Sequence, residues 1–158
     1  MPRASAAAAA NLAEVTNWPK QRKSIEDALR KLLGKLPKQR VDLQLKTIDE
    51  QDFPGYSRRR INYFVDEWER ISAWLFVPEY EEDAPALLCC HDEVANGKDE
   101  PAGLEGEPTL ALAKHYAELG FVTIAPDTIT AGERVVPGKQ PYDTSVFYKE
   151  HSKASALG

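Results

Sequence analysis

The stretch PALLCCHDEVANGKDEPAGLEGEPTLALAKHYAELGFVTIAPD, residues 85–127, decides the fold. It opens with one continuous apolar run (86–90) and closes with another (121–125), and such runs are typical of strands covered on both faces. Between them lie a glycine-bearing loop and a segment with helical apolar spacing (110–119) that ends at Gly120. Strand, loop, helix and strand in this order predict a parallel βαβ unit with a right-handed crossover.

The residues before this unit predict antiparallel strands. Apolar and polar residues alternate over Ile61–Val65 and again over Ile71–Val77, with a short polar connection between them, so a hairpin is expected. Alternation over 41–46 predicts a further half-buried strand, and Asp52–Gly55 has the composition of a turn. The predicted fold class is α/β, with an antiparallel pair followed by a parallel βαβ unit.

The amino-terminal segment predicts a helix behind a tail. Over 17–36 the apolar residues fall on one stripe of a helix, which glycine and proline signals then end. The stripe consists of Trp18, Ile25, Leu29, Leu32, Leu33 and Leu36. Residues 1–16 are Ala-rich and are expected to be a disordered tail, which leaves 37–158 as the α/β part.

Composition excludes several partners. The chain has 158 residues, of which 42% are hydrophobic and 28% charged, as in ordinary soluble domains. A net charge of −5 argues against a nucleic-acid surface, and no apolar run reaches the roughly 20 residues that span a membrane. The adjacent Cys89 and Cys90 are expected to be buried strand cysteines without a disulfide. This favours the cytoplasm weakly, and secretion stays open as the alternative.

The candidate site lies where the two apolar strands end. Ligands of an open parallel sheet bind at the carboxyl ends of its strands, which places His91, Asp92 and Glu93 beside Asp127. Three chemistries compete there: a metal site, a phosphate loop and an oxyanion loop.

The first two chemistries fit the sequence poorly. A metal site would draw on His91, Asp92, Glu93, His115 and His151, whose spacing matches no metal motif. A phosphate loop would use Gly97, Gly103 and Gly106, but no phosphate-binding motif is present and carboxylates crowd the loop. We therefore expect neither a metal nor another cofactor.

In an oxyanion loop the backbone leaves regular structure at the tip of a strand, so that one N–H can point into a cleft. Acyl-transfer enzymes on an open α/β sheet have such a loop after the third strand. Here the chain resembles the amino-terminal half of the α/β-hydrolase superfamily, in its dienelactone hydrolase and acetyl-esterase-like group. The similarity covers roughly residues 55–158. The matching segments are Ile61–Val65, Ile71–Pro78, Pro85–His91, Gly97–Leu104, Phe121–Asp127 and Gly132–Arg134.

The resemblance implies that Glu93, the third residue of the His-x-x turn, supplies an oxyanion N–H. Asp92 stands at the middle position, where the family often has glycine. The implied substrate is a small carboxylic ester or lactone, attacked by a serine-type nucleophile. Asp127 is expected to brace the loop after its strand, and Glu133 and Arg134 to hold the excursion over 128–151, in preference to contacting substrate.

The catalytic triad is missing from the sequence. No GxSxG turn occurs, and the nearest approach, at Ser57, lacks the second glycine and comes too early in the chain. The expected interpretation is an amino-terminal part of an esterase, inactive alone. The sheet order that the resemblance implies would leave the strand at 86–90 as a bare sheet edge. The alternative is a non-catalytic remnant or pseudo-hydrolase that acts, if at all, by binding. The oligomeric state is left open.

Overall fold

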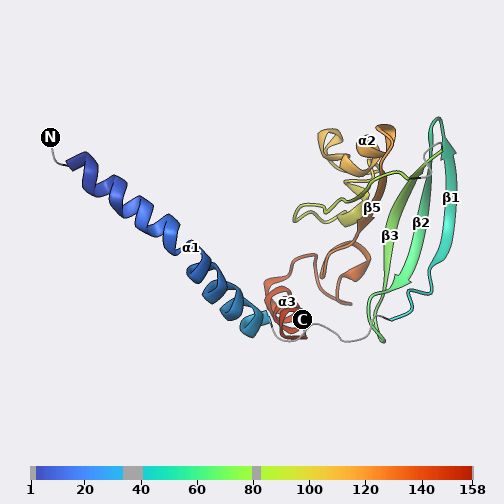
Figure 1. The fold of residues 1–158 in the computed structure, drawn as a ribbon. Helices are drawn as coiled ribbons and strands as arrows, with labels where there is room; N and C mark the ends of the chain where they lie inside the picture. The colour runs from blue at the N-terminus through green and yellow to red at the C-terminus, as the bar shows by residue number, and fades with distance from the viewer. Residues whose placement is uncertain (1–2, 34–40, 80–82, 158) are drawn as a thin grey trace. The chain divides into compact units, whose positions relative to one another are not determined.

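A computed structural model describes residues 3–33, 41–79 and 83–157, with side chains at 17–32, 41–79 and 83–150 (Figure 1). The chain divides into two units. One takes in residues 1–38 and 152–158, and the other, residues 39–151, contains the sheet and the candidate site. Each unit is described by itself.

The first unit contains the long helix α1 (Arg3–Leu33), with Pro19 inside it. A disordered tail was expected over residues 1–16, and α1 runs through most of that segment. The boundary between a tail and a helix at residue 17 stays a prediction. The described members of the apolar stripe, Trp18, Ile25, Leu29 and Leu32, are all exposed. Leu36 and the side chain of Leu33 lie outside the described part of the chain.

The second unit is built on a five-stranded mixed sheet with the strand order β1-β2-β3-β5-β4. The strands are β1 (Lys46–Phe53), β2 (Tyr56–Phe64), β3 (Arg70–Pro78), β4 (Ala86–Leu88) and β5 (Val122–Pro126). Neighbouring strands are antiparallel except β4 and β5, which are parallel. Figure 1 shows β1, β2 and β3 side by side, with β5 next to β3. The α/β class is confirmed.

The predicted hairpin is confirmed as β2 and β3, with Ile61 opposite Ala73. Its connection is a tight turn because the Asp66 carboxylate accepts hydrogen bonds from the N–H groups of Trp68 and Glu69. The turn predicted at Asp52–Gly55 joins β1 to β2, and Gly55 supplies the positive φ of 88° that the turn needs.

The strand predicted over 41–46 is wrong. Gln44 has a φ of 42°, and its N–H bonds to the Asp42 side chain, so residues 41–45 are irregular and the strand begins only at Lys46. The strand that precedes β2 is β1, whose residues are exposed apart from the half-buried Phe53. The sequence of β1, KTIDEQDF, has little apolar periodicity, and for that reason this strand was not predicted.

The βαβ unit is confirmed. After β4 come two single 3₁₀ turns, η1 (Gly97–Asp99) and η2 (Pro108–Leu110), and then α2 (Leu112–Glu118). Helix α2 buries Ala113 and Ala117 against the sheet, and the Thr123 hydroxyl donates to the Ala113 carbonyl at 2.8 Å. A third 3₁₀ turn, η3 (Gly132–Arg134), and helix α3 (Thr144–Leu157) follow β5.

Strand β4 differs from its prediction in burial. It lies at the sheet edge, as expected, but it is only three residues long and Leu88 is 65% exposed, so it is not covered on both faces. The cysteines follow the strand: Cys89 is buried and Cys90 is exposed, which corrects the expectation that both are buried. Burial raises the pKa of the Cys89 thiol, and the neighbouring Cys90 adds to the rise.

Among the described residues, no helix is long and apolar enough to cross a membrane.

Candidate functional site

The loops after β4 and β5 meet at one edge of the sheet because the two strands are parallel neighbours. His91, Asp92 and Glu93 come from the first loop, and Asp127 and Thr128 begin the second. The structure therefore brings the two predicted halves of the site together.

The His91 side chain is the link between the loops. It is buried, and its Nε2 accepts a hydrogen bond from the backbone N–H of Thr128 at 3.0 Å. A backbone amide can only donate, so we assign the ring proton to Nδ1. The Nδ1–H then donates to the carbonyl of the adjacent Asp92 at 2.6 Å.

The Asp92 carbonyl is held by three donors. Besides His91, it accepts the Val94 N–H at 2.8 Å and the Tyr142 hydroxyl at 3.1 Å. The Asp92–Glu93 peptide is trans, so its N–H points opposite to its carbonyl. The Glu93 N–H is thus directed away from the His91 ring, and within the described part of the chain it has no hydrogen-bond partner.

The Asp127 side chain also links the loop after β4 to the loop after β5. Its Oδ1 accepts the Lys98 backbone N–H at 2.8 Å, and its Oδ2 accepts the Lys98 ammonium at 2.8 Å and the Glu133 N–H at 3.0 Å. The side chains of Lys98 and Asp127 are 3% and 0% exposed. A buried carboxylate with this many donors is fully satisfied, which is what its burial requires.

The ammonium of Lys98 also reaches Glu133, at 2.6 Å. Burial by itself lowers the pKa of Lys98, but the hydrogen bonds and charges of Asp127 and Glu133 outweigh that effect and leave the pKa above its ordinary value. Lys98 is therefore a fixed cation within the folded protein and not a proton donor poised near neutral pH.

Two arginines extend this network to the hairpin. Arg60 on β2 bonds to Glu133 at 2.8 Å, and Arg134 bonds to Glu69 and donates to the Asp127 carbonyl. Asp127, Glu133 and Arg134 thus hold the loop after β5 against β2, the hairpin connection and η1. Their contacts are those of a brace.

Two glycines make room for the Asp127 carboxylate. Gly97 and Gly132 have φ values of 52° and 50°, and a Cβ built on either one would overlap the carboxylate oxygens. Gly97 therefore faces a buried carboxylate, which is the opposite of a phosphate cradle.

The other histidines lie apart from the site. His115 is on the exposed side of α2, in edge contact with Tyr116, and the side chain of His151 lies outside the described part. Among the described side chains, no three His, Cys, Asp or Glu residues form a group that could hold a metal ion.

Sequence analysis did not single out Lys98, Thr128 or Tyr142. Lys98 and Tyr142 lie in segments without apolar periodicity, and their partners are 29 and 50 residues away. The only signal was that Lys98 sits between Gly97 and Asp99, at the start of the glycine-bearing loop.

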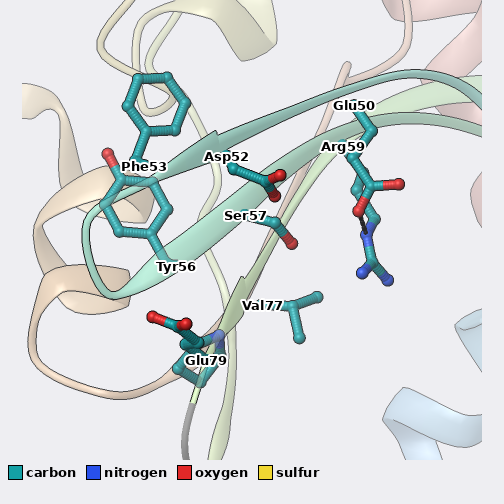
Figure 2. A pocket seen from close by; sticks show the side chains of 9 residues that line it. Glu50, Asp52, Phe53, Tyr56, Ser57, Arg59, Val77 and Glu79 are labelled. Carbon is teal, nitrogen blue, oxygen red and sulfur yellow. Dashed lines mark hydrogen bonds and ion pairs between the residues drawn. The ribbon is translucent and has the colours of Figure 1, made fainter.

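A groove of about 430 Å³ lies on the antiparallel strands, away from this site (Figure 2). It is bordered by Pro78 and Glu79, past the point where Phe76 pairs with Thr123, and so lies toward the amino end of β5. Figure 2 shows the ion pair between Glu50 and Arg59 on its wall. Ser57 lines the groove, and the described residues around it include no histidine.

No protein-family model matches the chain, and no curated protein matches it either. A solved structure is similar: a protein of Bacteroides fragilis NCTC 9343 described as a "putative acetyl xylan esterase", with a TM-score of 0.64 and 20% sequence identity. The superposition covers 87% of this chain and 39% of that chain, so this chain spans well under half of that protein's length. At this identity the likeness shows a shared fold.

Proposed function

We propose that this chain is the oxyanion side of a carboxylic-ester hydrolase with the α/β-hydrolase fold. The antiparallel hairpin, the parallel pair β4 and β5, and the fold shared with an esterase-like protein support the proposal. The substrate class is a small carboxylic ester or lactone.

The observation that carries the proposal is the Asp92–Glu93 peptide. Three donors hold its carbonyl inward, and its N–H, at the carboxyl edge of the parallel strands, has no partner among the residues that the structure describes. A fixed, unpaired N–H is what stabilises the charge that develops on an ester carbonyl oxygen during nucleophilic attack, because it costs no reorganisation in the transition state.

In this proposal a serine oxygen attacks the ester carbonyl while a general base takes the hydroxyl proton, and the Glu93 N–H donates to the resulting oxyanion. The tetrahedral intermediate collapses, the alcohol leaves with a proton supplied by a general acid, and water then hydrolyses the acyl-enzyme. The Lys98–Asp127 brace keeps the two loops at the spacing that this geometry needs.

The nucleophile and its base are proposed to lie outside these 158 residues. The sequence has no GxSxG turn, and the esterase-like protein is much longer than this chain. Residues 1–158 alone are therefore expected to show no saturable hydrolysis of nitrophenyl acetate above a denatured control. The non-catalytic alternative predicts a stop codon directly after Gly158 and no activity in any form.

The decisive test uses a longer form of the protein, in which the chain reaches a GxSxG turn as this proposal requires. Replacing Glu93 by Pro removes the N–H, and we expect kcat to fall about 100- to 1,000-fold, as when other enzymes lose one oxyanion donor. Replacing Glu93 by Ala removes the carboxylate but keeps the N–H, so it should leave kcat within about threefold. Equal effects of the two substitutions would contradict the assignment of the N–H.

A further inference from the structure

Tyr142 has a backbone conformation that needs an explanation. Its φ is 56°, in the left-handed region that costs a bulky residue roughly 1–2 kcal/mol. It lies on the segment between η3 and α3, and its own N–H is anchored on the Thr130 carbonyl at 3.1 Å. Backbone strain of this kind persists only where the surrounding contacts hold it, and it concentrates at functional sites.

The hydroxyl of Tyr142 lies against His91 and Asp92, in the loop after β4. It donates to the Asp92 carbonyl at 3.1 Å and lies 3.3 Å from both His91 Nδ1 and the Thr128 hydroxyl. Burial raises the pKa of the Tyr142 phenol, so the hydroxyl keeps the proton that it donates. In the described part of the chain, no other side chain from beyond β5 donates a hydrogen bond to the Asp92 carbonyl.

We propose that Tyr142 is a positioning residue, whose hydroxyl holds the Asp92 carbonyl inward and thereby sets the direction of the Glu93 N–H. The Asp92 carbonyl and the Glu93 N–H belong to one planar peptide, so fixing the first fixes the second. His91 and Val94 alone hold the carbonyl from within its own loop, and Tyr142 ties it to the segment after β5. The effect of Tyr142 on catalysis rests on the proposed ester hydrolysis, whereas the hydrogen bond from its hydroxyl to the Asp92 carbonyl does not depend on that proposal.

The experiment compares Tyr142→Phe with Tyr148→Phe. Both changes remove one hydroxyl, and Tyr142→Phe keeps the ring that packs 5.6 Å from Phe147. Tyr148 is 67% exposed, and none of the hydrogen bonds found among the described residues uses its hydroxyl, so it is the matched control. The denaturant midpoint of each variant establishes that it is folded.

The first measurement is made on ¹⁵N-labelled residues 1–158. In Tyr142→Phe the amide resonances of Glu93 and Val94 should shift and their heteronuclear NOE should fall, while amides of β2 and β3 stay in place. Tyr148→Phe should leave all of them unchanged. Unaltered Glu93 and Val94 amides in Tyr142→Phe would overturn the proposal, whatever the activity.

The second measurement is made on the longer product that carries the nucleophile. Tyr142→Phe should lower kcat for nitrophenyl acetate about tenfold and leave KM within about twofold, because the oxyanion forms only in the transition state. An equal change in KM, or no loss of kcat, would overturn the positioning role. If the unmodified longer product shows no turnover, the proposed function fails, and the amide measurement still decides whether Tyr142 holds the peptide.

Discussion

At the scale of single residues, Asp127 illustrates how a buried charge is stabilised. Lys98 supplies its counter-charge and two of its hydrogen bonds, and Gly97 and Gly132 leave space for its oxygens. The pair adds little net stability compared with an apolar pair, since both charges lose their water. Removing only one of the two charges is strongly destabilising, because the other charge then stays buried without its partner.

We therefore expect Lys98→Met to destabilise the chain by about 3–5 kcal/mol, the usual cost of leaving a buried ion without its partner. Urea unfolding followed by circular dichroism measures the change. Lys114→Met is the control: Lys114 is 48% exposed and lies 4.0 Å from Glu118, so its loss should cost no more than about 0.5 kcal/mol. Similar losses in both variants would mean that the brace does not depend on the buried pair.

At the scale of elements, β4 is the vulnerable part of the sheet. Cys89 N–H bonds to the Ile124 carbonyl, and Leu88 is aligned with Ile124, so the backbone groups of Leu88 face away from β5. An edge strand with unpaired backbone groups and an exposed leucine is a site of edge-to-edge association, although its three-residue length limits the pairing.

Leu88→Lys should reduce self-association of residues 1–158, because a lysine on an edge strand opposes pairing with a second edge. The free energy of unfolding should change by no more than about 0.5 kcal/mol, since the side chain is largely exposed. Sedimentation velocity at increasing concentration measures the association. The same substitution at Leu119, which directly follows α2 and is 60% exposed, should leave association unchanged, and an equal effect there would argue against edge pairing.

At the scale of the whole molecule, the raised pKa values of five groups act in one direction at high pH. The pKa of Lys98 is raised by its two carboxylate partners, and the pKa values of Cys89, Tyr56, Tyr63 and Tyr142 are raised chiefly by burial. In each case the folded state binds the proton more tightly than the unfolded chain does.

Stability should therefore be constant from neutral pH to about pH 8 and fall as the pH rises through and above the unfolded-state values of 9.0 for cysteine, 10.0 for tyrosine and 10.5 for lysine. Urea midpoints between about pH 8 and about pH 11.5 measure this. Tyr63→Phe should make the decline shallower, and Tyr148→Phe, at an exposed position, should not. Stability that rises with pH in this range would contradict the directions of the shifts.

The elements whose apolar residues recur at a regular spacing were predicted well. The alternation of Ile61–Val65 and Ile71–Val77 predicted the hairpin, and the spacing over 110–119 together with Gly120 predicted α2 and its end. These elements form because their period matches one buried face, and a period is visible in sequence. Where the period was absent, as in β1, or misleading, as at Gln44, the prediction failed.

The sequence by itself determined the α/β class and the meeting of the loops after β4 and β5, since parallel strands place their carboxyl ends together. Only the tertiary structure decided that Lys98 pairs with Asp127, that the Tyr142 hydroxyl reaches the Asp92 carbonyl, and that the Glu93 N–H finds no hydrogen-bond partner among the described residues. The physical reason is the range of the interactions. Strand and helix patterns repeat over a few neighbours, whereas each of these contacts joins single polar atoms from segments 29 to 50 residues apart, and no repeat records their pairing.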